Sequence, residues 1–128
     1  MSVSSASLAG RDLVQVALFV ADLERSTAWY RDVLGLPFLF ETNGMVFFQA
    51  GGARLMIGRG ERARGAGGVL YFDAPDLPAL AEALAAKGVV FRRPADLLQR
   101  TEAGDLMLQS FEDLDGNALA LMGVVPRA

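Results

Sequence analysis

Short apolar runs and one helical stripe organise the first half of the chain. Residues 13–20 read LVQVALFV, a short run rich in Val, Leu and Phe that predicts a buried strand. Asp22 is a candidate N-cap, and a helix ending at Gly35 is predicted by a mostly apolar stripe at helical spacing, namely Leu23, Thr27, Tyr30 and Leu34. Three more strands are predicted at 37–41, 45–50 and 54–57, with turns at Asn43–Gly44 and Gly51–Gly52.

The second half of the chain repeats this pattern. A strand at 69–73 is followed by the N-cap candidate Asp76 and a helix that ends at Gly88, with a stripe formed by Leu77, Leu80, Ala81 and Leu84. Strands are then predicted at 89–91, 106–111 and 118–122, with Asp115–Gly116 as the last tight turn. Asp22 matches Asp76 at an offset of 76 − 22 = 54, and Gly35 matches Gly88 at 88 − 35 = 53. Each half therefore reads as β-α-β-β-β.

Units of about 55 residues bury too little apolar surface to be stable alone, so the two halves are expected to pair. The predicted organisation is one structural domain with four segments, which are a loose tail (1–10), a first module (11–58), a linker (59–68) and a second module (69–124). The linker is rich in glycine and carries Arg59, Arg62 and Arg64. A role in solubility explains these arginines, and binding of a phosphate or carboxylate group is the alternative.

Composition narrows the functional classes. The chain has 128 residues, 52% of them hydrophobic and 21% charged, with a net charge of −3, which is typical of a globular protein with a real core. A mildly acidic protein gives no electrostatic reason to expect nucleic acid or an anionic membrane as a partner. No signal peptide and no apolar run long enough to span a membrane stands in the sequence, so a cytoplasmic location is expected.

The chain contains no cysteine and no histidine. Thiolate chemistry, disulfides and the commonest general base are therefore excluded. Any metal would have to be held by carboxylates and carbonyls, which suit calcium or magnesium better than zinc, iron or nickel. No cofactor is predicted.

Three stretches carry a resemblance to a known family. They are VALFVADLERSTAWYRDVLGL at 16–36, the DL…KGVVF pattern at 76–91, and FEDLDGNALAL at 111–121. Together they resemble the vicinal-oxygen-chelate superfamily of glyoxalases, bleomycin resistance proteins and extradiol dioxygenases. The resemblance implies an α+β fold in which two βαβββ modules form an open, curved half-barrel sheet with the helices outside. It also implies a site on the concave surface, and a homodimer.

In that family four side chains hold a divalent metal, one from the first and one from the last strand of each module. The matching positions here are Gln15, Met56, Val69 (15 + 54) and Ala120. Valine and alanine have no donor atom, methionine is a soft thioether and glutamine is a weak neutral ligand. The sequence therefore predicts no metal site, and the metal-dependent lyase and dioxygenase activities of the family are not expected.

The same strand alternation predicts the residues that line the concave surface. They are Gln15, Ala17, Phe19, Arg54, Met56, Val69, Tyr71, Asp73, Gln109, Phe111, Ala118 and Ala120. A mostly apolar hollow with aromatic faces and a few polar groups is typical of a small-molecule pocket, and the alternative is that these residues simply fill the half-barrel. Gln15 in an apolar strand is expected to need a polar partner, such as Tyr71, Gln109 or a water.

Two further features have a structural and a functional interpretation. Trp29, the single tryptophan, lies off the helical stripe, which favours either packing at the edge of the core or a subunit contact in a homodimer. Glu112, Asp113 and Asp115 surround a turn, and we interpret them as turn chemistry rather than as an acid–base pair.

Three functions are compatible with these residues. The favoured one is a metal-free small-molecule binding protein that sequesters a hydrophobic or cationic antibiotic-like ligand. The first alternative is a divergent lyase or isomerase that works without a metal through Gln15, Arg54, Tyr71 and Asp73, although no nucleophile–base pair supports it and no catalytic residue is assigned. The second alternative is a scaffold or regulatory domain with a vestigial cavity.

Overall fold

A computed structural model describes residues 9–60 and 68–127. The first module contains, in chain order, β1 (Gln15–Val20), α1 (Leu23–Ala28), a π-helical turn η2 (Trp29–Val33), β2 (Phe38–Thr42), β3 (Met45–Ala50) and β4 (Ala53–Arg59). Its four strands form one sheet in the order β1-β4-β3-β2. The β1–β4 pair is parallel and the other two pairs are antiparallel.

The second module has the same topology. It contains β5 (Val69–Asp73), α2 (Leu77–Ala86), β6 (Asp96–Arg100), β7 (Asp105–Glu112) and β8 (Ala118–Val125). Its sheet has the order β5-β8-β7-β6, with β5 and β8 parallel. The protein thus has two open, mixed four-stranded sheets with few helices, which is the α+β architecture that the family resemblance implied.

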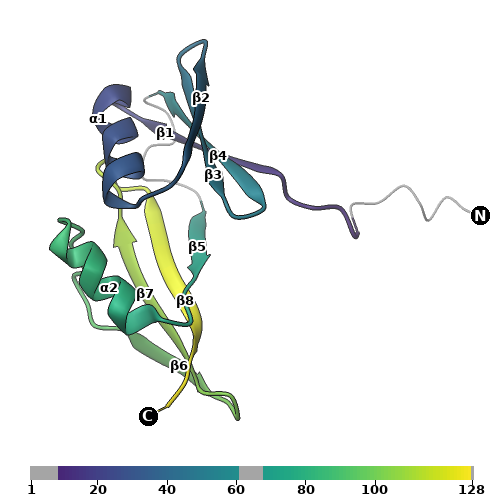
Figure 1. Ribbon diagram of the computed structural model, residues 1–128, viewed down its shortest axis with the longest axis vertical. Coiled ribbons are helices and arrows are strands. Elements are labelled where there is room, and N and C mark those ends of the chain that lie inside the picture. The colour runs from purple at the N-terminus through teal and green to yellow at the C-terminus, as the bar shows by residue number, and fades with distance from the viewer. Residues whose placement is uncertain (1–8, 61–67, 128) are drawn as a thin grey trace, which may run out of the picture.

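The two sheets lie one beyond the other along the long axis of the molecule, with α1 and α2 on the same side (Figure 1). The core is formed where each helix packs on its sheet and where the modules meet. Its largest fully buried side chains come from both modules and are Val20, Tyr30, Val46, Phe48, Leu55, Ile57, Leu77 and Leu119. No helix among the described residues is long and apolar enough to cross a membrane.

The two predicted helices are confirmed, but they begin differently. The Asp22 side chain accepts a hydrogen bond from the Arg25 amide at 3.0 Å, which is the N-cap contact expected from the sequence. Asp76 makes no such side-chain contact at the start of α2, where proline stands in the first turn instead.

One predicted strand, at 89–91, is wrong. The Val89 amide donates to the Leu84 carbonyl at 3.1 Å, so this segment closes the end of α2 instead of joining the sheet. Gly88, at φ +107°, permits this reversal of the chain. The strand that pairs with β7 is β6, several residues further on, and its five residues are all exposed, so it carries no alternating apolar signal.

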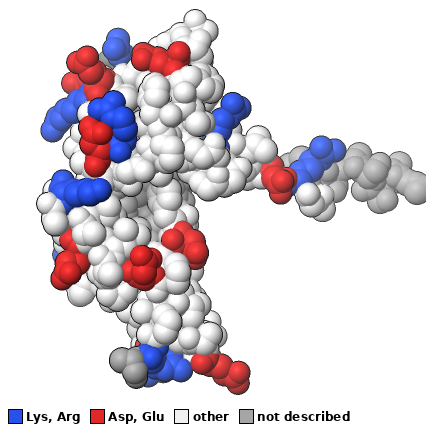
Figure 2. Space-filling model, in the orientation of Figure 1, with Lys and Arg blue, Asp and Glu red and all other residues white. Residues whose placement is uncertain are grey.

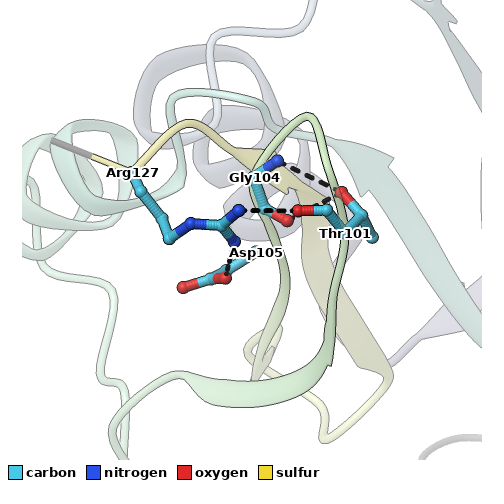
Figure 3. Close-up of polar contacts among 4 residues, drawn as sticks. All are labelled: Thr101, Gly104, Asp105 and Arg127. Atoms are coloured by element: carbon cyan, nitrogen blue, oxygen red, sulfur yellow. Dashed lines mark hydrogen bonds and ion pairs between the residues drawn. The ribbon is translucent and has the colours of Figure 1, made fainter.

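The C-terminal end is tied to the β6–β7 hairpin (Figure 3). The Arg127 guanidinium contacts the Asp105 carboxylate at 2.5 Å and donates to the Thr101 carbonyl at 2.7 Å. Within the hairpin, the Thr101 hydroxyl donates to the Gly104 carbonyl. The predicted tail (1–10) falls mostly outside the described residues, as do Arg62 and Arg64 of the predicted linker.

Candidate functional site

Each sheet has one face covered by its helix and one face turned away from it, which we call the open face. In the first sheet Leu55 and Ile57 point to the helix and are buried in the core. Strand alternation therefore places Arg54 and Met56 on the open face. The register pairs these two with β1, and the predicted lining residues that share the open face are Gln15, Ala17, Phe19, Arg54 and Met56.

The second sheet repeats this arrangement. Leu119 and Leu121 point to the helix, and the open face carries Val69, Tyr71, Asp73, Ala118 and Ala120. The two positions that match the family's metal ligands are offset across the strand pair in the same way in both modules. Met56 pairs with Ala17, two residues after Gln15, and Ala120 pairs with Tyr71, two residues after Val69.

The prediction that Gln109 and Phe111 line the same surface is wrong. β7 pairs Gln109 with Leu121 and Phe111 with Leu119, and directly paired residues point to the same side of a sheet. Phe111 is therefore 5% exposed in the core on the helix side. The Gln109 side chain donates to the Arg93 carbonyl at 2.9 Å.

Gln15 is exposed at the start of β1. A solvated amide does not need a protein partner, so the expectation that Gln15 is buried and requires one is wrong. The residue still lies on the open face beside Arg54. The Arg54 guanidinium is 5.7 Å from the centre of the Phe47 ring, a cation–π arrangement on the same face.

The residues at the family's metal positions do not fit a divalent ion, since Val69 and Ala120 offer no donor atom. Met56 is 9% exposed and offers only a thioether. Within residues 9–60 and 68–127, no three carboxylate side chains gather in a way that would hold a metal. No chemical step is therefore assigned to a metal ion.

A hollow of about 610 Å³ lies between the two modules, along the outer edges of β1 and β5. We call it the edge hollow. Its walls are Leu13, Val16, Ala50, Gly51, Ala53, Arg54, Leu55, Val69, Leu70, Tyr71, Phe72 and Asp73. The surface is indented between the modules, on the side from which the N-terminal segment leaves the body (Figure 2). Four predicted residues, Arg54, Val69, Tyr71 and Asp73, therefore line one hollow.

Other predicted residues lie elsewhere. Phe19 and Met56 line a separate hollow of about 370 Å³ on the first sheet, together with Met45 and Glu41. Met56 and Val69, which the family resemblance places around one ion, thus line different hollows. Sequence reasoning missed Leu13, which is 76% exposed before β1, although it stands two residues before Gln15 in the predicted strand at 13–20 and alternation places it on the same face as Gln15.

The acidic turn connects the two modules. The Tyr30 hydroxyl donates to Asp113 Oδ2 at 2.8 Å, and both side chains are buried. Asn117 Nδ2 donates to the Phe19 carbonyl at 3.2 Å, and the Ala21 amide donates to Asp115 Oδ1 at 3.1 Å. We call these three contacts the inter-module latch.

Asp113 also organises its own turn, because its Oδ1 accepts from the amides of Asp115 and Asn117 at 2.8 Å each. The interpretation of the acidic residues as turn chemistry is confirmed for Asp113. Burial raises the pKa of the Tyr30 phenol well above its ordinary range, and the nearby Asp113 carboxylate raises it further. The phenol is therefore held in its protonated, donating form.

The paired βαβββ modules define the class of fold, and sequence comparison defines the family. The chain belongs to the Glyoxalase/Bleomycin resistance protein/Dioxygenase superfamily, whose family model matches residues 12–121. None of the curated proteins compared matches the chain significantly.

Solved structures agree with this assignment. The chain is similar to lactoylglutathione lyase from Agrobacterium tumefaciens, with a TM-score of 0.73 and 19% identity over 88% of this chain and 93% of that chain. It is also similar to the fosfomycin resistance protein FosX from Listeria monocytogenes, with a TM-score of 0.70 and 20% identity over 88% and 92%. At this level of identity, the likeness shows the fold alone.

Proposed function

We propose that the protein binds a small, largely apolar molecule in the edge hollow and does so without a metal ion. The observation that carries this proposal is the hollow itself, about 610 Å³ between the modules, which is within the size range of ligand pockets. Its walls are mostly apolar, and the ring of Tyr71 is 58% exposed beside it. An exposed aromatic ring gives a flat ligand a surface to stack on.

The edge hollow carries one charge of each sign, since Arg54 and Asp73 both line it, and the part of its wall beside Tyr71 suits a ligand with a cationic group. Asp73 is the acidic residue of this wall, and it follows Tyr71 on the same face of β5. A carboxylate beside an aromatic ring suits an ammonium group. Hydrophobic cationic antibiotics combine these properties, and sequestration of such a compound is the proposed activity. One of the structurally similar proteins is a fosfomycin resistance protein, which makes antibiotic binding a reasonable first test.

Calorimetric titration of the full chain with a panel of hydrophobic cationic antibiotics and neutral analogues tests the proposal. We expect Asp73→Asn to weaken binding of the cationic compounds about tenfold and Tyr71→Ala to weaken both classes. Asp96→Asn, an exposed acid on β6, is the matched control and should bind normally. Unchanged binding in Tyr71→Ala would contradict the assignment to this hollow.

The absence of a metal requirement is tested separately by elemental analysis of protein purified without chelator. We expect less than about a tenth of an equivalent of transition metal per chain, because the donor set offers so few ligand atoms. One ion per chain would overturn the metal-free proposal.

We also propose a homodimer whose contact lies beside the edge hollow and leaves the Tyr71 and Asp73 wall open to the ligand. Leu13 and Val14 are 76% and 62% exposed, and Val69 is 39% exposed nearby. Large apolar side chains on two open strand edges favour coverage by a second copy. Sedimentation should show a dimer, and Leu13→Glu should shift it to monomer. The predicted contribution of Trp29 to a dimer stays a prediction.

A metal-free enzyme is the second candidate, because Arg54, Tyr71 and Asp73 line one hollow and place three polar groups near a bound molecule. Conversion of a bound compound, detected by mass spectrometry and lost in Tyr71→Phe, would support it over simple sequestration. Failure of every compound to bind would favour the scaffold function.

A further inference from the structure

A second hollow lies at the other side of the module junction, and the proposed function does not use it. It has a volume of about 460 Å³ and is formed by η2 of the first module, the loop after α2 and the β7–β8 turn. We call it the tryptophan groove. The residues used below are Trp29, Val90, Arg92, Arg93, Glu112 and Leu114.

Trp29 supplies a fixed aromatic wall. Its ring meets the Tyr30 ring edge-on, with centroids 5.0 Å apart and an interplanar angle of 82°. Tyr30 is fully buried, and its hydroxyl is hydrogen-bonded to Asp113. The ring against which Trp29 packs is therefore held in place. Across the groove, Val90 and Leu114 are 66% and 40% exposed. The groove therefore presents an aromatic face and apolar side chains to a flat molecule.

The charges of the groove favour an anion. Arg92 Nη1 lies 3.9 Å from Glu112 Oε1, which is long for an ion pair, and both side chains are mostly exposed. This pair is therefore weak. Arg93 forms no ion pair with any other residue that the structure describes. The Asp113 carboxylate is 7% exposed and is already engaged by Tyr30, Asn117 and two amides. Two guanidinium groups thus face one accessible carboxylate, in a chain whose net charge is −3.

We propose that the tryptophan groove binds a molecule with a flat apolar part and an anionic group, either a carboxylate or a phosphate monoester. The flat part stacks on Trp29, and the anionic group accepts hydrogen bonds from Arg93 and Arg92. Guanidinium groups suit both kinds of anion because their planar donors match two oxygens at once.

The probes are 2-naphthoate, 2-naphthyl phosphate and the neutral 2-naphthamide, titrated into the full chain by calorimetry. Because the chain has one tryptophan, a single indole N–H resonance reports on the groove in a nitrogen–proton spectrum. We expect the two anions to bind, to shift this resonance and to bind about tenfold more weakly to Arg93→Gln. The relative affinities of naphthoate and naphthyl phosphate identify which anion is preferred.

Arg100→Gln is the matched control, since this arginine is exposed on β6 and lies outside the groove. It should bind both anions normally. The proposal is overturned if naphthamide binds as tightly as naphthoate, if Arg100→Gln weakens binding as much as Arg93→Gln, or if the indole resonance does not move. A shift of that resonance on raising the protein concentration alone would also overturn it, by showing that a second copy covers the groove. Edge-hollow ligands should leave the indole resonance unchanged, so the two sites are tested independently.

Discussion

The two modules share one topology but use matched positions differently. Tyr30 in the first helix corresponds to Leu84 in the second, at 84 − 30 = 54, and both are buried, at 0% and 6% exposure. Leu84 only packs, whereas the Tyr30 hydroxyl reaches Asp113 in the other module. A position that serves packing in one copy of a repeat can thus hold the two copies together in the other.

The last turns of the modules differ in the same way. The β3–β4 turn is tight, with Ala50 paired to Ala53. The β7–β8 turn is longer, closing at Glu112 and Ala118, and it supplies all three latch contacts. The second module therefore contributes two carboxylate acceptors, Asp113 and Asp115, and the side-chain amide donor of Asn117. The first module contributes the Tyr30 hydroxyl and the backbone at the end of β1.

The largest expected effect comes from Gly123 in β8. By the offset that relates Met56 to Ala120 (120 − 56 = 64), its counterpart is Arg59 (123 − 64 = 59). A Cβ at Gly123 would stand 2.3 Å from the Ala74 carbonyl oxygen. We expect Gly123→Ala to lower the free energy of unfolding by about 3 kcal/mol, measured by urea denaturation.

Gly52→Ala is the control for that substitution, because nothing lies within 4 Å of a Cβ placed at Gly52. Its stability should stay within about 0.5 kcal/mol of the parent. An equal loss in both variants would show that the close approach of β8 to the loop before α2 is not what distinguishes the modules.

The latch is tested by Tyr30→Phe. This change removes the hydroxyl and leaves the buried Asp113 carboxylate without one donor, so we expect a loss of about 1–3 kcal/mol in the same denaturation assay. Tyr71→Phe, at an exposed tyrosine, should change stability little. If both variants matched the parent, the hydroxyl would not stabilise the module junction.

The raised pKa of Tyr30 predicts a pH dependence. In the unfolded chain this phenol ionises near pH 10, while the folded protein keeps it protonated to higher pH. The unfolded state therefore holds fewer protons above pH 10, and stability should fall by about 1.4 kcal/mol per pH unit there. Comparing the alkaline slope of the parent with that of Tyr30→Phe isolates this effect, since the variant should lack that part of the slope.

The smallest expected effect separates the two helix starts. Asp22→Ala removes the hydrogen bond to the Arg25 amide and should lower stability by about 1 kcal/mol. Asp76→Ala removes no side-chain cap contact and should cost about 0.3 kcal/mol or less. Thermal denaturation of both variants checks the difference, and equal losses would show that the caps are equivalent in solution.

Sequence reasoning recovered the repeat because the helical stripes and strands recur at a nearly constant offset, which also located the family positions. It misassigned 89–91, because an apolar pair after a helix has the same composition whether it enters a sheet or closes the helix. It misassigned the face of Gln109 and Phe111 for a related reason. The facing of β7 depends on which residues close the β7–β8 turn, and a shift of one residue reverses it.

The sequence alone determined the order of the elements, the duplication and the shortage of donor atoms at the family's metal positions, since these depend on local periodicity and on residue chemistry. Only the tertiary structure decided that Tyr30 joins the modules, that Trp29 faces a groove with two arginines, and that Phe19 and Met56 line a different hollow from Val69 and Tyr71. These contacts connect residues far apart in the chain, and they follow from how the modules pack rather than from any spacing within them.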